Sequence, residues 1–495
     1  MSIEPSPSQV AQFRELIADR LGLQFDESKL GNLARVLVRH GGRDLAGYLA
    51  MLAAEPRPFE VLHRLAVDLT ITETYFYRNN EQIQAFAEVA MPACLQARGG
   101  LPVRVLSAGC ASGEEPYTLA IAAREAVGAG SAQIRAIDAN PAMLAKAEAA
   151  RYSAWSLREV NPAMRERWFV RDGAFYALNE GVRRSVRFER RNLAREDGEL
   201  WAPGSYDIVF CRNVLMYFRP DQAQAAVARI AGAISPGGYL FLGHAETLRG
   251  LSNDFHLCHT HATFYYRRKL HVGELAPPAR PGPPASTGGP FLPLLPDEPA
   301  WGDVIARAAR RIDTLAVAAP TAAGDPPAQP DLRHPLSCAR KEPFEPGPGQ
   351  AGTLPQPHAD DPDVLLPKAV SLSQSGALAA AQDICHALLA RDELNAGAHY
   401  VLALCCEEGG DNPAALLHYR SAVHLDPGFA LARLHVGVLE RRMAELEAAR
   451  RDLAQALILL QHEDPSRLSL FGGGFPRSAL VDLCRVELAA LGVSL

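Results

Sequence analysis

The chain has 495 residues, of which 48% are apolar, and its formal net charge is −6. One hydrophobic core cannot organise a chain of this length, so we expect two or three folded domains. The negative charge argues against a broad surface for nucleic acid. No apolar run approaches the roughly 20 residues of a membrane helix, and the first residues do not resemble a secretion signal. Nine cysteines without the spacing of a metal site fit reduced thiols, so we expect a cytoplasmic protein that binds no metal.

Helices are predicted throughout residues 1–90, which we expect to form a small helical domain. Apolar residues recur on one stripe of the first segment, and two glycines, Gly41 and Gly42, end the second. Basic residues crowd this region, and we interpret them as solvated helix faces rather than as a patch for an acidic partner. The predicted helices are Gln9–Leu21, a helix from Asp26 to His40, Arg43–Ala53 and Phe59–Leu69.

Strands and helices alternate across residues 91–272, which is the pattern of a doubly wound, Rossmann-like parallel sheet of the α/β class. A final pair of short segments has hairpin-like spacing and predicts an antiparallel edge. The predicted strands are Val103–Ser107, Gln133–Ile137, Val186–Glu189, Asp207–Phe210 and Tyr239–Gly243, and the final pair is Phe255–Leu257 and Thr263–Arg267.

Aromatic residues cluster around two turn-forming sequences inside this domain, Asp172-Gly173 and Asn179-Glu180-Gly181. Both sequences are typical of tight turns between strands. They predict a small β-subdomain of hairpins inserted in the sheet domain.

Residues 273–360 are rich in proline, alanine and glycine, as in the run APPARPGPPASTGGP. Such a composition cannot bury enough apolar surface to fold, so we expect a flexible linker. Trp301–Ala318 interrupts it with apolar residues at helical spacing. This segment is either a short docking helix or a helix that forms only transiently.

Small and aromatic residues recur with a period of about 34 residues after residue 361. The register predicts C-terminal all-α tetratricopeptide repeats over residues 361–495, with Ser478–Leu491 as the cap helix. The alternative is a generic bundle of helical hairpins. The recurring residues are Ala403, Ala415, Tyr419, Ala422 and Pro427 in the middle unit, Ala369, Ala381, Cys385 and Leu388 before it, and Gly437, Ala449, Leu453 and Ala456 after it.

The turn after the first predicted strand indicates the ligand of the sheet domain. It reads SAGCASGEE from Ser107 to Glu115, at a strand end where α/β sheets bind nucleotide-like ligands. Glu114 and Glu115 stand where a phosphate-binding turn would carry Gly-Lys-Ser/Thr, and carboxylates there repel a phosphate and attract a cation. S-adenosylmethionine has no phosphate and carries a sulfonium and an ammonium. The turn therefore predicts a methyltransferase rather than a dehydrogenase or an ATPase.

Polar residues follow two other predicted strands at the same edge of the sheet. Asp138 ends the second strand, where a carboxylate can accept both ribose hydroxyls of an adenosine or, alternatively, cap the following helix. Arg212 and Asn213 end the fourth strand. Many methyltransferases that act on amino nitrogens carry Asn-Pro-Pro-Tyr at this place, whereas a cationic edge rich in donors suits an anionic acceptor. These residues indicate a carboxylate substrate.

Four separated motifs carry a family resemblance. Through these four motifs, residues 1–270 resemble the CheR-type methyltransferases, which esterify glutamate side chains on bacterial chemoreceptors. The appended repeats resemble the tetratricopeptide-bearing branch of that family, found in chemosensory-like pathways such as surface sensing. The resemblance implies S-adenosyl-L-methionine as cofactor, the cytoplasmic domain of a methyl-accepting chemoreceptor as substrate, and a protein partner for the repeats. The motifs are LTITETYFYR (Leu69–Arg78), SAGCASGEEPYTLAI (Ser107–Ile121), FCRNVLMYF (Phe210–Phe218) and PGGYLFLGHAETL (Pro236–Leu248).

The resemblance also implies roles for individual residues. Arg78 and Tyr217 are expected to face the transferring methyl group as the catalytic residues. Glu115 is expected at the methionine or ribose end of the cofactor, with Asn192 and Leu193 beside the adenine. The expected cofactor-binding set is Thr72, Thr74, Arg78, Glu115, Asp138, Asn192, Leu193, Arg212 and Asn213.

One residue of the chain departs from the family motif. Thr72 stands where the family carries asparagine, so we expect the contact with the methionine carboxylate of the cofactor to be weakened or rearranged. A glutamate carboxylate is already ionised near neutral pH, so we expect no general base and interpret His244 as a structural residue. Alignment and desolvation of the nucleophile then carry catalysis.

The mode of receptor recruitment is a further expectation. Some family members bind a receptor-tail peptide as an added strand on the inserted hairpins. Residues 171–186 match that subdomain only loosely, so we expect recruitment through the repeats instead.

Two other functions stay open at this point. The first is a non-catalytic adaptor, in which a degenerate methyltransferase domain senses the cofactor and the repeats bind partners. The intact site residues argue against a methyltransferase domain that has lost its activity. The second is a methyltransferase that acts on a small molecule or RNA, against which the missing Asn-Pro-Pro-Tyr motif and the lack of a broad basic surface argue.

Overall fold

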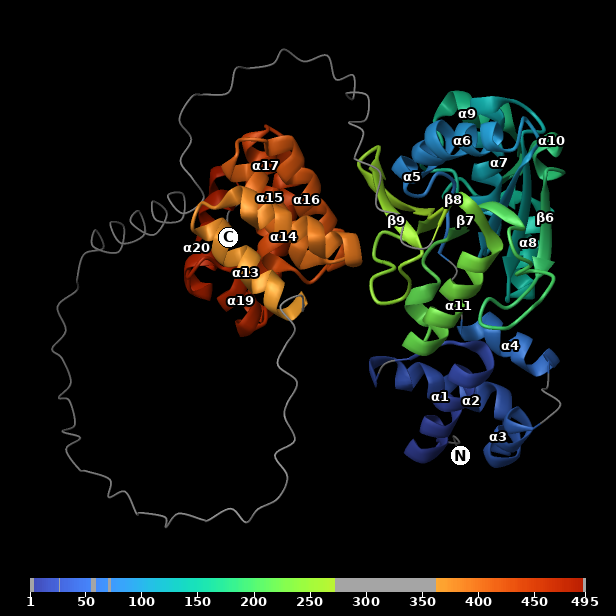
Figure 1. The fold of residues 1–495 in the computed structure, drawn as a ribbon. Coiled ribbons are helices and arrows are strands. Elements are labelled where there is room, and N and C mark those ends of the chain that lie inside the picture. Colours follow the sequence, from blue (N-terminus) through green and yellow to red (C-terminus); the bar gives the residue numbers. More distant parts are fainter. Residues whose placement is uncertain (1–3, 26, 55–58, 70–72, 272–361, 493–495) are drawn as a thin grey trace, which may run out of the picture. The chain divides into compact units, whose positions relative to one another are not determined.

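The computed structural model of the chain describes residues 4–25, 27–54, 59–69, 73–271 and 362–492 (Figure 1). The chain divides into two compact units, Met1–Gly288 with Ala390–Asn395 and Gly289–Leu389 with Ala396–Leu495. The predicted linker and its candidate helix lie outside the described residues, so both stay predictions. Among the described helices, none combines the length and the apolar character needed to cross a membrane.

Helices make up the N-terminal part of the first unit, as predicted. Ser6 begins the first of them with a capping box, in which its hydroxyl accepts from the Gln9 N–H. The second helix starts at Leu30 after a 3₁₀ turn at Glu27–Lys29, later than the predicted start at Asp26. The helices bury one apolar cluster together. They are α1 (Pro7–Leu21), α2 (Leu30–Gly41), α3 (Leu45–Ala53) and α4 (Phe59–Leu69).

A seven-stranded sheet carries the rest of the first unit, in the order β6-β2-β1-β7-β8-β10-β9 (Figure 1). The first five strands of that order pair in parallel, and β10 pairs antiparallel with both β8 and β9. This confirms the predicted α/β sheet and its antiparallel edge. The strands are β1 (Val103–Ala108), β2 (Ala132–Asp138), β6 (Val186–Arg190), β7 (Tyr206–Cys211), β8 (Ile234–Leu242), β9 (Phe255–Thr260) and β10 (Thr263–Arg268).

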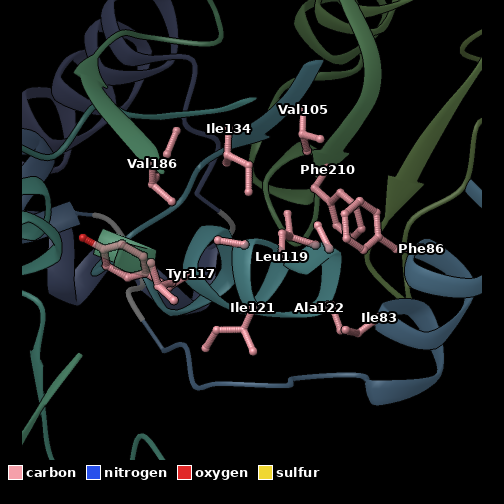
Figure 2. Close-up of a cluster of buried hydrophobic side chains, with 14 of the residues drawn as sticks. Ile83, Phe86, Val105, Tyr117, Leu119, Ile121, Ala122, Ile134, Val186 and Phe210 are labelled. Atoms are coloured by element: carbon pink, nitrogen blue, oxygen red, sulfur yellow. The ribbon is translucent and has the colours of Figure 1, made fainter. Parts of the chain in front are cut away.

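The core of this sheet domain lies between the parallel strands and helix α7 (Glu114–Val127). Figure 2 shows Leu119 of this helix facing side chains of three strands, Val105, Ile134 and Phe210, all of them buried. Helix α7 begins at the turn after β1, so the same packing fixes the position of that turn. Two further helices, α8 (Pro141–Ala149) and α11 (Pro220–Ala233), pack against β6 and β8 respectively.

The apolar cluster of the sheet domain begins earlier in the chain than expected. Phe76 and Phe86 belong to it, and the helices of residues 80–97 pack against α7. The two clusters of the first unit thus divide between Leu69 and Phe76, whereas the expected division lay at residue 90. The domain boundaries themselves stay predictions. These helices are α5 (Asn80–Ala85), the π-helix η2 (Phe86–Ala90) and α6 (Met91–Ala97).

A three-stranded antiparallel sheet in the order β3-β5-β4 forms the inserted subdomain. One predicted hairpin is confirmed, with its turn at Asp172-Gly173 between β4 and β5. The second is wrong, because Asn179 caps the short helix α10 (Glu180–Arg183) by accepting from the Gly181 N–H. The strands are β3 (Arg151–Tyr152), β4 (Phe169–Asp172) and β5 (Phe175–Leu178), and α9 (Pro162–Trp168) precedes β4.

The described part of the second unit is all-helical, and its helices recur in pairs at the roughly 34-residue period of the sequence. Ala403, Ala415 and Tyr419 of the middle pair are fully buried, as the register predicts. A helical repeat is therefore confirmed, while the tetratricopeptide assignment stays a prediction. The helices are α13 (Pro362–Gln374), α14 (Leu378–Arg391), α15 (Ala396–Glu408), α16 (Asn412–Leu425), α17 (Ala430–Arg442), α18 (Leu446–His462), α19 (Pro465–Phe471) and α20 (Arg477–Ala490).

Candidate active site

The turn between β1 and α7 lies at the carboxyl edge of the parallel strands. Gly109 and Gly113 have left-handed φ values of 79° and 92°, which favour glycine. A Cβ on Gly109 would collide with the side chain of Val214, and one on Gly113 would lie 2.8 Å from the Cβ of Ala147. Both glycines are therefore required by the close approach of the turn to its neighbours.

Asp138 at the end of β2 holds this turn in place. Its two carboxylate oxygens accept from the N–H groups of Ala111 at 2.8 Å and Asn140 at 2.7 Å. Burial raises the pKa of the Asp138 carboxyl above its ordinary value, and these backbone N–H groups oppose the rise. Asn140, rather than Asp138, caps α8, because its side chain accepts from the N–H groups of Ala142 and Met143. Asp138 therefore keeps its place on the ligand edge.

Glu115 and Arg212 form a buried ion pair, with 2.8 Å between Glu115 Oε2 and Arg212 Nε. Ser107 donates its hydroxyl to the other Glu115 oxygen at 2.8 Å. Arg212 Nη1 donates to the Arg78 carbonyl at 2.8 Å and to Gln82 Oε1 at 3.0 Å. Groups of the protein itself thus accept from two nitrogens of the Arg212 guanidinium, Nε and Nη1, and its role towards a ligand stays a prediction.

The two carboxylates of the turn also differ from the open negative charge that the sequence suggested. The charge of Glu115 is balanced by Arg212. Glu114 is buried and accepts from the Ser112 hydroxyl at 2.7 Å, and burial raises its pKa. A carboxylate has about four acceptor positions, so Glu115 can still accept from a ligand hydroxyl or ammonium.

Arg78 supplies the unpaired positive charge that Arg212 does not. It lies between Tyr77 and Asn79, whose left-handed φ values of 60° and 59° are uncommon for residues with a side chain. The side chain is half-buried, and its Nη1 donates to the Glu73 carbonyl at 2.8 Å. No carboxylate among the described residues pairs with it, so its charge is available to an anion. Thr74 is half-buried in the same segment, and Thr72 lies outside the described residues.

A cavity of about 350 Å³ opens beside the turn. One wall comes from strand ends and contains Asp138, Asn192, Leu193, Asn213 and Tyr217, which the sequence predicted as site residues. The volume and the mostly apolar lining with a few polar groups fit a nucleoside. The opposite wall comes from the N-terminal helices and was not predicted: Leu21, Leu23, Gln24, Phe25, Lys29, Asn32, Ala66, Asp68 and Leu69.

Asn192 and Leu193 have local structural roles as well. Asn192 Oδ1 accepts from the Ala194 N–H at 2.9 Å, which makes it a turn residue, and its amide N–H groups remain for a ligand. The Leu193 carbonyl accepts from Arg229 at 3.0 Å. Arg78, Glu115 and Arg212 are not among the residues that line the cavity.

Glu246 is a site residue that sequence reasoning missed. Its Oε2 accepts from the N–H groups of Gly243 at 2.8 Å and Asn213 at 2.6 Å, and its Oε1 accepts from those of Val214 at 2.9 Å and Met216 at 3.2 Å. The carboxylate thereby fixes the loop that carries Asn213 into the cavity wall. An acid inside the otherwise apolar motif PGGYLFLGHAETL was the available signal.

His244 precedes Glu246 by two residues. Burial lowers the pKa of its imidazole, and the positive charge of Arg212 lowers it further. The imidazole is therefore neutral near pH 7.

The fold is that of an α/β methyltransferase, with a nucleoside-sized cavity at the carboxyl edge of its parallel sheet. The family described as "CheR methyltransferase, SAM binding domain" matches residues 72–264. The chain belongs to the CheR methyltransferase family, and its cofactor is S-adenosylmethionine.

Its relatives include proteins with and without the C-terminal unit. The chain is 33% identical to the chemotaxis protein methyltransferase of Klebsiella aerogenes, over 51% of this chain and 88% of that protein. It is 30% identical to chemotaxis protein methyltransferase 2 of Vibrio cholerae, over 53% of this chain and 93% of that protein. It is 29% identical to the probable biofilm formation methyltransferase WspC of Pseudomonas putida, over 89% of this chain and 96% of that protein. The last similarity extends into the helical repeats.

Proposed function

We propose that the protein transfers a methyl group from S-adenosylmethionine to glutamate side chains of a methyl-accepting chemoreceptor-type protein. The observation that carries this proposal is the Arg78 guanidinium, which has no carboxylate partner among the described residues and belongs to a residue whose backbone carbonyl accepts from Arg212. A guanidinium fork suits a carboxylate acceptor and does not suit an amine.

The reaction needs little from the protein beyond position. The cofactor supplies a methyl group on a sulfonium, which is already activated for displacement. A glutamate oxygen forms the new bond to the methyl carbon while the C–S bond breaks and its electron pair stays on sulfur, which gives the methyl ester and S-adenosylhomocysteine. The carboxylate is ionised near neutral pH, so no general base is required. Arg78 orients the acceptor, and Tyr217 adds a phenolic hydrogen bond.

The remaining residues would hold the cofactor. Asp138 suits the ribose hydroxyls and Asn192 the adenine edge, since both line the cavity. Glu115 suits the methionine portion, with Thr72 and Thr74 on the segment before Arg78. The role that we propose for Arg212 is to hold Glu115 and the Arg78 carbonyl in register.

The test is transfer of tritiated methyl groups to purified receptor cytoplasmic domains, followed by mild base. A carboxyl ester releases the label as methanol, and we expect this result for the wild-type chain. The variant Arg78→Gln should lose about 100-fold in kcat/KM, and Arg78→Lys should retain part of the rate, because lysine keeps the charge without the planar fork. Label that resists base would exclude an ester. Binding of S-adenosylhomocysteine without any transfer would favour the non-catalytic adaptor.

A further inference from the structure

A stacked arginine projects from the loop between β3 and α9. The Arg158 guanidinium carbon lies 3.6 Å from the centre of the Tyr75 ring and 4.2 Å from that of the Trp155 ring. Arg158 Nη1 also donates to the Trp155 carbonyl at 2.9 Å, which limits the rotation of the guanidinium. The Trp155 side chain is nevertheless 68% exposed. We call Tyr75, Arg158 and Trp155 the stacked ledge.

The stacked ledge is fixed to the segment that carries Arg78. The Phe76 N–H donates to the Ser156 carbonyl at 3.0 Å, which joins the two loops. Phe76 is fully buried and makes an edge contact with Tyr152, at 4.8 Å between ring centres. Leu157 is buried in the same core. The ledge is therefore a rigid surface feature and not a loose loop.

Arg78 and Arg158 flank the same aromatic ring. The Arg78 guanidinium carbon lies 5.9 Å from the centre of the Tyr75 ring, against 3.6 Å for Arg158. The cation of the ledge is thus a neighbour of the cation that we assign to the acceptor carboxylate.

Neither guanidinium has a carboxylate partner in the described part of the chain. Other arginines of the same domain are paired, such as Arg104 with Asp207 at 2.7 Å and Arg135 with Glu189 at 2.6 Å. An oriented, stacked guanidinium with free N–H groups binds a carboxylate at a small entropic cost, since little side-chain freedom is left to lose. An exposed indole beside it adds apolar contact area.

We infer that the stacked ledge binds a second carboxylate of the methyl-accepting protein, close to the glutamate that is methylated. This inference rests on the proposed function, because it takes Arg78 as the residue that holds the first carboxylate. Side chains one turn apart on a helix lie on the same face, so one helical segment can present two carboxylates to two cations that contact the same ring. The ledge therefore selects acceptor segments with a pair of acidic residues on one face.

The first test is the kinetics of Arg158→Gln on a receptor cytoplasmic domain. We expect the KM for the acceptor to rise about 10-fold, with kcat and the affinity for S-adenosylhomocysteine unchanged. The KM of Arg158→Lys should lie between those of the wild type and Arg158→Gln, because lysine keeps the charge and loses the stacking. The matched control is Arg167→Gln, which removes a guanidinium stacked 5.1 Å from the Trp168 ring and paired with Glu125, near the far end of α7. An unchanged KM in Arg158→Gln, or an equal rise in the control, overturns the inference.

A binding experiment separates this inference from the proposed function. The probe is a synthetic helical peptide with two glutamates one turn apart, compared with the peptide in which one of them is glutamine. In the presence of S-adenosylhomocysteine, the wild-type chain should bind the two-glutamate peptide more tightly, and Arg158→Gln should remove that preference. A preference for the two-glutamate peptide without any methyl transfer would support carboxylate binding by the stacked ledge and contradict the proposed reaction. Equal binding of both peptides by the wild-type chain, or no binding of either, contradicts the ledge.

Discussion

Two arginines near the turn after β1 have opposite environments and therefore different uses. Arg212 is 4% exposed and its charge is balanced by Glu115, whereas Arg78 is half-buried and has no carboxylate partner among the described residues. A buried charge is tolerated only with a partner, so the first arginine is committed to the fold. The second is available to a substrate.

The Glu115–Arg212 pair gives a prediction on stability and cofactor binding. Removing one member leaves a buried charge without compensation, so Glu115→Ala should lower the free energy of unfolding by about 3 kcal/mol. The double variant Glu115→Ala/Arg212→Met should regain most of that stability while its affinity for S-adenosylhomocysteine stays low. Urea unfolding and calorimetric titration measure the two quantities. A double variant that binds like the wild type would show that Glu115 is not a cofactor contact.

The sequence predicted which residues stand at the strand ends, and the cavity wall contains five of them. It did not predict their pairing. Arg212 meets Glu115 from 97 positions away and Gln82 from 130 positions away, and such contacts depend on how the strands are ordered. Glu246 was missed for the same reason, since its four N–H donors come together only in the folded loop.

At the scale of helices, α15 and α16 bring two histidines together inside the repeat unit. His399 Nδ1 and His418 Nδ1 lie 3.1 Å apart, and one nitrogen must donate while the other accepts. Burial, followed by the charge of His386, lowers the pKa of His418 to about 4. The folded repeat unit therefore disfavours the protonated form of this residue.

This histidine predicts a loss of stability in mild acid. In the unfolded chain His418 has its ordinary pKa of about 6.5, which lies above the folded value. The free energy of unfolding is therefore highest above pH 6.5 and falls as the pH drops towards 4, because the unfolded chain binds the proton first. The loss should be on the order of 2 kcal/mol and smaller in His418→Gln. Urea unfolding of the full chain at several pH values between these limits measures it. The exposed His462→Gln should keep the wild-type pH dependence.

Helices and strands were predictable where the signal is local. The recurrence of small residues after residue 361 is such a signal, and the helix pairs follow it. The segment at Asn179-Glu180-Gly181 fits both a hairpin turn and a helix cap, and only the hydrogen bond from the Gly181 N–H to Asn179 distinguishes them. The helices of residues 80–90 pack against α7, which the sequence did not indicate because helical periodicity does not identify the surface that a helix packs against.

For the whole molecule, all predicted site residues that the structure describes belong to the first unit. A chain of residues 1–272 should therefore bind S-adenosylhomocysteine like the full chain, and this binding also controls for its folding. If the repeats recruit the receptor, its KM for a receptor cytoplasmic domain should be at least about 10-fold higher, because the second contact no longer raises the local concentration of acceptor. Methyl transfer assays on both chains compare the two values. Equal KM values would contradict recruitment through the repeats.

The cavity wall formed by the N-terminal domain could not be predicted from the sequence. Leu21 and Leu69 belong to the apolar stripes of helices, and in the sequence they look like core residues of the N-terminal domain. Their additional contact with a cavity depends on how two domains meet. Nothing in a single periodic pattern specifies that.

Direct contacts also join the two walls, among them the hydrogen bond from the Gln24 N–H to the Tyr217 carbonyl at 2.6 Å and a bridge between Leu23 and Phe218. A ligand in the cavity contacts both walls, so its binding free energy adds to the contacts that hold the walls together and makes their separation rarer as its concentration rises. Proteases act on separated, partly open forms. We therefore expect bound S-adenosylmethionine to slow proteolysis of this protein, so that its lifetime rises with the supply of methyl donor.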